Sequence, residues 1–311
     1  MNGALAAVRA LHFAATLSLE GAIVFRVAAL APAFDRARQS VPAGLRSFLA
    51  SMTAASWIVA VLSAAGWLFV LGGVIAGVSP VAALQRGTDW ILLTQTKIGM
   101  VWQASGGLAL MLAFVWLSSR SPRGLIWKNL LAVLLVLAFA GSLTWAGHGA
   151  ATPGAVGDFH LAADILHLVA AGIWLGGLLP FATLMGWARG DAKRILAARN
   201  AAERFSLLAL VCVLHLLGSG IVNSWVLVGN VSGLTGTLYG RLLLAKIGLF
   251  LSMLGFAAVN RLHLMPRLKD GTSAARAAAR RLALHSVCEV ILGLAVLGIV
   301  GVLGMLPPPA H

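Results

Sequence analysis

The apolar and polar positions of this chain form eight long apolar stretches, separated by short polar connections. A helix needs about 20 apolar residues to cross the hydrocarbon core of a bilayer. The stretches lie near residues 4–31, 48–77, 90–118, 125–147, 160–187, 204–228, 239–264 and 282–306. They do not alternate as strands would, and a segment in lipid must satisfy its backbone hydrogen bonds internally. We therefore predict an all-α polytopic membrane protein with eight transmembrane helices.

Composition agrees with this fold class, and the charge pattern adds an orientation. Only 10% of the residues are charged, against roughly 25% in soluble domains, and the net charge is +14. The basic residues concentrate in the connections between spans 1 and 2, 3 and 4, 5 and 6, and 7 and 8. Cytoplasmic connections carry such an excess, so both termini are expected in the periplasm. The charge thus indicates contact with anionic membrane lipid and no nucleic-acid partner.

Two motifs recur at about half the chain length. Leu11-His12, followed by Ala15 and Gly21, resembles Leu166-His167, followed by Ala170 and Gly176. Lys97 and Lys246 each follow a Gly-Thr pair by the same interval and precede Ile-Gly. We predict a tandem repeat of four helices, with halves 1–150 and 151–311. An even number of spans gives the two halves the same orientation.

Polar residues at the outer ends of the spans form the candidate site. His160, Asp164 and His167 fall on one helical face. His148 precedes this helix, and the repeat makes His12 the counterpart of His167 and would place the two face to face. Imidazole and carboxylate suit Cu(II), Zn²⁺ and similar ions, whereas paired histidines can also hold haem. Interfacial histidines bonded to neighbouring helices are the structural alternative. The predicted metal ligands are His12, His148, His160, Asp164 and His167.

Further polar residues inside the spans are candidates for a pathway or for its support. Glu20 lies near mid-bilayer, where a carboxylate is costly and usually faces a cavity or a partner. The two lysines are expected about seven residues below the outer surface, where they either snorkel to it or pair with Glu20, Asp164 or an anion. A thiol and imidazole group nearer the cytoplasm would suit Cu(I), although ordinary packing explains it as well. The candidates are Glu20, Lys97, Lys246, Cys212, His215, His285, Cys288 and Glu289.

Catalytic signatures are absent from the sequence. It contains no P-loop, no Gly-x-Ser-x-Gly and no His-Glu-x-x-His motif. Its two cysteines both fall inside predicted spans and give no disulfide framework. We therefore expect no catalytic residues and no hydrolytic or ATP-driven activity, and a membrane oxidoreductase stays open as the alternative to a protein without enzyme activity.

Several motifs resemble the copper resistance protein D (CopD) family. They are Arg204-Phe-Ser206, Gly220-Ile-Val-Asn223, Leu234-Thr-Gly-Thr-Leu-Tyr-Gly-Arg241 with Lys246, Asn260-Arg261 with Pro266, the helix from Asp164 to Leu178, and the opening Leu11-His12-Phe13. The resemblance places a CopD-like domain at about 203–306. It implies copper uptake across the bacterial inner membrane beside a periplasmic copper-binding protein of the CopC type, here a separate chain.

Three functional hypotheses follow from these observations. The leading one is copper transport from the periplasm toward the cytoplasm through the outer His/Asp site. The alternative is a haem-b electron carrier or membrane oxidoreductase that uses a transmembrane His pair as axial ligands. The third is a purely structural membrane partner or sensor for a periplasmic copper protein.

Overall fold

The computed structural model describes residues 2–118, 125–146, 154–190, 192–269 and 272–309. Within these ranges the regular secondary structure is entirely helical, and eight helices are long and apolar enough to cross a membrane. The prediction of an all-α protein with eight spans is confirmed. The spans are α1 (Asn2–Val24), extended by a π-helical turn (Phe25–Leu30) into α2 (Ala31–Arg36), then α3 (Ala43–Ala76), α6 (Lys97–Leu117), α7 (Leu125–Gly141) with a 3₁₀ turn (Ser142–Ala146), α8 (Gly154–Ala188), α9 (Ala192–Val228), α11 (Leu238–Val259) with two irregular turns (Asn260–Leu264 and Met265–Lys269), and α12 (Ser273–Leu303).

Three short helices lie between the spans: α4 (Pro80–Gln85), α5 (Thr88–Gln95) and α10 (Val231–Gly236). The spans that follow α5 and α10 begin in the same way. The Thr96 hydroxyl accepts a hydrogen bond from the Gly99 N–H (3.0 Å), and Thr237 accepts one from Gly240 (3.0 Å). Such side-chain caps satisfy the free N–H groups at the start of a helix. Both glycines lie so close to the carbonyl groups of the preceding short helix that a side chain would collide with them.

This shared start corrects the predicted lysine pair. The stretch expected as one helix from residue 90 breaks at Thr96, and Lys97 is an exposed residue in the first turn of α6. Lys246 instead lies well inside α11. The structurally equivalent segments are Thr96–Gly99 and Thr237–Gly240, so the two lysines do not occupy matching positions.

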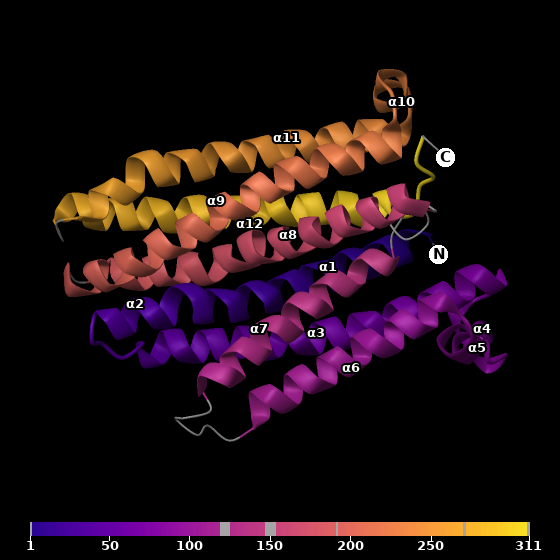
Figure 1. Cartoon of the computed structure of the whole chain (residues 1–311), viewed down its shortest axis with the longest axis horizontal. Helices are drawn as coiled ribbons and strands as arrows, with labels where there is room; N and C mark the ends of the chain where they lie inside the picture. Colours follow the sequence, from indigo (N-terminus) through magenta and orange to yellow (C-terminus); the bar gives the residue numbers. More distant parts are fainter. Residues whose placement is uncertain (1, 119–124, 147–153, 191, 270–271, 310–311) are drawn as a thin grey trace.

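The helices α1 and α8 form the centre of the bundle and run in the same direction (Figure 1). They are the most buried of the eight spans. Their backbones touch where Gly21 meets Gly176, since a Cβ atom on either residue would overlap the backbone of the other helix. Small residues permit this close approach between membrane helices. Gly21 and Gly176 hold the same place in the two recurring sequence motifs.

The two ends of the bundle differ in chemistry. Both chain termini, with α4, α5 and α10, lie at one end (Figure 1). The connections from α2 to α3, α8 to α9 and α11 to α12 lie at the other end (Figure 1). These connections and the adjoining helix ends carry most of the basic side chains, among them Arg36, Arg38, Arg46, Arg189, Lys193, Arg194, Arg267, Lys269, Arg276, Arg280 and Arg281.

Candidate metal-binding residues in the membrane

His12 lies buried on α1 and is held by α3. Its Nδ1 atom is 3.0 Å from the carbonyl oxygen of Ala60 and 3.1 Å from the Ser63 hydroxyl. Because a carbonyl oxygen only accepts hydrogen bonds, Nδ1 carries the proton in the neutral ring. The Nε2 atom then presents a lone pair. The edge of the ring packs against Trp67, with centroids 5.8 Å apart.

His167 on α8 is held in the same way by α9. Its Nδ1 atom lies 2.9 Å from the Ser219 hydroxyl oxygen. That hydroxyl donates its own proton to the carbonyl of His215 one turn earlier (2.5 Å), so its oxygen accepts from the ring. Nδ1 is therefore the donor and Nε2 again has the free lone pair. A histidine fixed through one ring nitrogen in this way is oriented to bind a metal through the other.

The two halves use equivalent positions next to these histidines but fill them with different chemistry. In the first half the guanidinium of Arg9 lies 4.6 Å above the Trp67 ring. In the second half the Asn223 side-chain amide donates to a carboxylate oxygen of Asp164 (2.9 Å). Arg9 and Asp164 each precede a histidine by three residues. The same three-residue spacing therefore carries a basic residue before His12 and an acidic residue before His167.

Charge balance around the two histidines consequently differs. Lys246 on α11 lies within electrostatic reach of both Asp164 and His167, so a lysine and a carboxylate offset each other there. Arg9 instead packs against Gly304 at the C-terminal end of α12, where helix carbonyl groups stabilise a cation. Lys246 therefore acts on His167 as a cation that Asp164 offsets in part, while Arg9 and His12 both pack against Trp67.

The five predicted metal ligands do not form one centre in the part of the chain that the structure describes. His160 is buried on the same side of α8 as His167. His12 and His167 each bond to the second span of their own half, which corrects the expectation that they face each other. No three His, Cys, Asp or Glu side chains among the described residues are arranged to hold a metal ion. His148 lies outside the described residues.

Glu20 is fully buried where α1 crosses α8. Neither of its carboxylate oxygens has a hydrogen-bond partner among the described residues. Its side chain occupies the space left by Gly172, where a Cβ atom would overlap the carboxylate. Removing an ion from water costs several kcal/mol even in a relaxed protein interior. This carboxylate is therefore the least compensated polar group of the central helix pair.

The predicted inner group is only partly assembled. Asn260 on the π-helical turn after α11 links two of its members: its amide nitrogen donates to Glu289 (2.9 Å), and its amide oxygen lies 2.8 Å from Nδ1 of His285. Cys288 is exposed. On α9, Cys212 is buried, whereas His215 is exposed and bonds to the Val211 carbonyl of its own helix. These two residues therefore do not form a joint site.

Ser63, Ser219, Asn223 and Asn260 are the polar partners that the sequence analysis missed. Ser63 and Ser219 follow their histidines by nearly equal intervals, 51 and 52 residues. That common spacing is a signal in the sequence, but serine is frequent in membrane helices and its role emerges only with the histidine beside it.

Comparison with known proteins identifies the family. The family model described as Copper resistance protein D matches residues 199–303, and Copper resistance protein D-like, N-terminal domain, matches residues 1–158. Copper resistance protein D of Pseudomonas syringae pv. tomato is 32% identical over 267 residues, which are 79% of this chain and 83% of that protein. Inner membrane protein YebZ of Escherichia coli (strain K12) is 32% identical over 70% of this chain and 72% of its own length.

A further relative is Copper transport protein CutJ of Bacillus subtilis (strain 168), 30% identical over 73% of this chain but only 40% of that protein. No solved structure matches the chain. The two family models match residues 1–158 and 199–303, and the relatives align over most of the chain. The chain is a multi-pass membrane protein and belongs to the copper resistance protein D family.

Proposed function

We propose that this chain carries copper ions across the bacterial inner membrane, from the periplasm toward the cytoplasm, and that it acts as a carrier and not as an enzyme. The observation that supports this most directly is the Nε2 lone pair of His167, which is fixed by the hydrogen bond from its ring to Ser219. Family membership supplies copper as the cargo. Imidazole is a common copper ligand.

His167 is the stronger of the two histidine candidates. Asp164, three residues before His167 on α8, supplies a carboxylate on the same helix, whereas the residue at that spacing before His12 is Arg9. Opposite charge in the immediate surroundings favours a bound cation. We therefore assign the outer copper ligand to His167, with Asp164 as its supporting anion.

The source of the ion is proposed to be a separate periplasmic copper-binding protein of the CopC type. Such a partner would meet the end of the bundle that holds both termini, α4, α5 and α10 (Figure 1). Basic side chains are concentrated at the opposite end. The assignment of the membrane follows the relative named as an inner membrane protein.

The haem-b alternative is not favoured by the family comparisons. The two histidines also turn toward different neighbouring helices, α3 and α9, whereas axial haem ligands must point at one iron. An absorption spectrum of the purified protein distinguishes the two functions. Copper transport predicts no Soret band.

The test of the proposal is copper accumulation in cells that depend on this chain for uptake. His167→Ala should lower the initial uptake rate about tenfold or more, because it removes the outer ligand, and His12→Ala should have a smaller effect. His263→Ala is the matched control, since His263 is exposed near the other end of the bundle. Uptake by His167→Ala at the wild-type rate, with equal protein in the membrane, would contradict the proposal.

A further inference from the structure

The buried carboxylate of Glu20 stands at the middle of the bundle with nothing to neutralise it among its described neighbours. The first span runs from Gly3 to Arg36, and Glu20 lies halfway along it. It immediately precedes Gly21, where α1 touches α8. Neither carboxylate oxygen is exposed or hydrogen-bonded to a described residue. A carboxylate in such a place normally pairs with a cation or lines a path for one.

Polar groups lead to Glu20 along one face of α1. His12, Thr16 and Glu20 follow one another at four-residue intervals, about 6 Å per step along the helix. All three are buried, and the Thr16 hydroxyl also lacks a hydrogen-bond partner in the described part of the chain. Buried polar groups without partners are rare in folded proteins, so Thr16 and Glu20, one turn apart on α1, are candidates for contact with a bound ion.

A thiol on α9 is the second candidate ligand. Cys212 is buried and near enough to Glu20 for their charges to interact. The glycine at position 172 keeps open the space that the carboxylate occupies. Thiolate sulfur selects Cu(I), and the carboxylate contributes the negative charge that a cation needs in a low-dielectric interior.

We propose that Glu20 and Cys212 form a binding station for a copper(I) ion in the middle of the membrane. The station rests on the proposed copper transport and extends it inward from His167. The position in α8 that the repeat pairs with Glu20 is Leu175, so the station belongs to the first half alone. The two halves then contribute different parts of one path.

Copper binding by purified protein tests the station independently of transport. The variant His12→Ala/His167→Ala removes the outer ligands, and it should still bind about one copper(I) ion per chain. Adding Glu20→Gln, which keeps the shape of the side chain without its charge, should lower that affinity at least tenfold, and Cys212→Ser should act in the same direction. Asp35→Asn is the control, because Asp35 is an exposed carboxylate at the end of α2.

The outcomes separate the two proposals. Copper binding that is unchanged by Glu20→Gln in a folded protein overturns the station, whatever the result for transport. Uptake that is insensitive to His167→Ala, combined with copper bound through Glu20, overturns the outer site and leaves the station standing. Size-exclusion profiles and thermal melting show that each variant is folded. Removal of a buried charge is not expected to destabilise the bundle.

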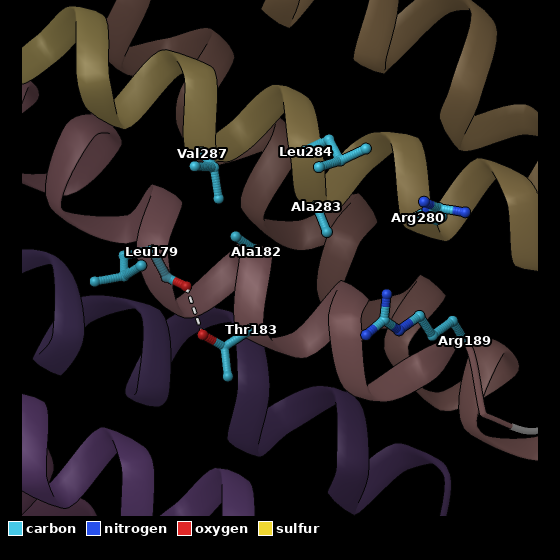
Figure 2. Close-up of a pocket in the computed structure, with 8 residues that line it drawn as sticks. All are labelled: Leu179, Ala182, Thr183, Arg189, Arg280, Ala283, Leu284 and Val287. Atoms are coloured by element: carbon cyan, nitrogen blue, oxygen red, sulfur yellow. Dashed lines mark hydrogen bonds between the residues drawn. The ribbon is translucent and has the colours of Figure 1, made fainter.

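A second, independent feature is a groove between α8 and α12 near the basic end of the bundle (Figure 2). Its volume is about 340 Å³. Leu179 and Val287 line one end, and Arg189 on α8 and Arg280 on α12 lie toward the other end (Figure 2). The Thr183 hydroxyl donates to the Leu179 carbonyl of its own helix (2.9 Å), so it adds little polarity to the groove.

The two arginines suit an anion from the membrane. Neither side chain makes a hydrogen bond or ion pair with the residues that the structure describes, and no carboxylate lines the groove. From Arg189 to Leu179 the helix spans ten residues, about 15 Å at 1.5 Å per residue. That length is about half the hydrocarbon thickness of a bilayer, the depth of one acyl chain.

We infer that this groove binds an anionic phospholipid, with its phosphate on Arg189 and Arg280 and an acyl chain along the leucine and valine side chains. Basic pockets between membrane helices on the cytoplasmic side recognise anionic head groups. A lipid bound there would bridge α8 and α12.

Thermal unfolding in detergent tests the groove with defined lipids. Phosphatidylglycerol should raise the unfolding temperature of the wild type more than phosphatidylcholine does, because a ligand of the native state stabilises it. Arg189→Gln/Arg280→Gln should lose that difference. Arg267→Gln/Arg276→Gln, two exposed arginines at the same end but outside the groove, should retain it. Equal stabilisation by both lipids, or an undiminished difference in the groove variant, overturns the inference.

Discussion

At the scale of single residues, the serine partners determine which nitrogen each histidine offers. A serine hydroxyl inside a helix commonly donates to the carbonyl of the preceding turn. Ser219 does so, and its oxygen is then available only as an acceptor for the His167 ring. His12 differs, because its Nδ1 proton can also be taken by the Ala60 carbonyl. Ser219 is therefore the acceptor on which the His167 ring depends, whereas His12 keeps a second acceptor, the Ala60 carbonyl, beside Ser63.

This difference gives a graded prediction. Ser219→Ala leaves the His167 ring without an acceptor and should weaken copper binding at the outer site about 10–100-fold, the usual cost of losing a partner behind a metal ligand. Ser63→Ala should have a smaller effect on His12, since the Ala60 carbonyl remains. Equilibrium copper titration of the purified variants measures both changes.

The matched control for the serine series is Ser252→Ala. Ser252 is exposed on α11, and its hydroxyl bonds only to the Gly248 carbonyl of its own helix. It should bind copper as the wild type does. An affinity for Ser219→Ala equal to that of Ser252→Ala would show that the ring is held by packing and not by the hydrogen bond.

At the scale of helices, hydropathy predicted the spans well because the bilayer imposes one length and one backbone geometry on every crossing segment. It predicted helix starts less well. The stretch near residue 90 is apolar throughout, yet Thr96 caps a new helix there, since a local hydrogen bond to the Gly99 N–H decides the break. The recurring Gly-Thr and Lys motif misled for the same reason. Lys97 begins the helix α6, whereas Lys246 lies well inside the helix α11.

The direction in which the two histidine rings point could not be predicted from the sequence either. The spacing of His12 and His167 predicted that both lie on central helices, and α1 and α8 are indeed central. Each ring instead bonds to another span, His12 to Ser63 on α3 and His167 to Ser219 on α9. These partners are 51 and 52 residues away in the sequence, so helical periodicity within α1 or α8 does not reveal them.

At the scale of the whole molecule, the two ends of the bundle present different surfaces to the two sides of the membrane. Termini and short helices occupy one end, and basic connections occupy the other (Figure 1). Lys and Arg near the ends of membrane helices resist translocation and set the overall orientation. Uptake toward the cytoplasm by way of His167 requires that the end holding the termini faces the periplasm.

That orientation is tested by reporter fusions to the full chain. Alkaline phosphatase, which is active only outside the cytoplasm, should be active when fused after His311 and inactive when inserted after Gly190 in the connection from α8 to α9. The second fusion is the matched comparison, because the basic residues Arg189, Lys193 and Arg194 around that site favour a cytoplasmic location. The opposite pattern of activities would show that the bundle has the reverse orientation in the membrane. His167 would then receive copper from the cytoplasm, and the same ligands would have to serve export.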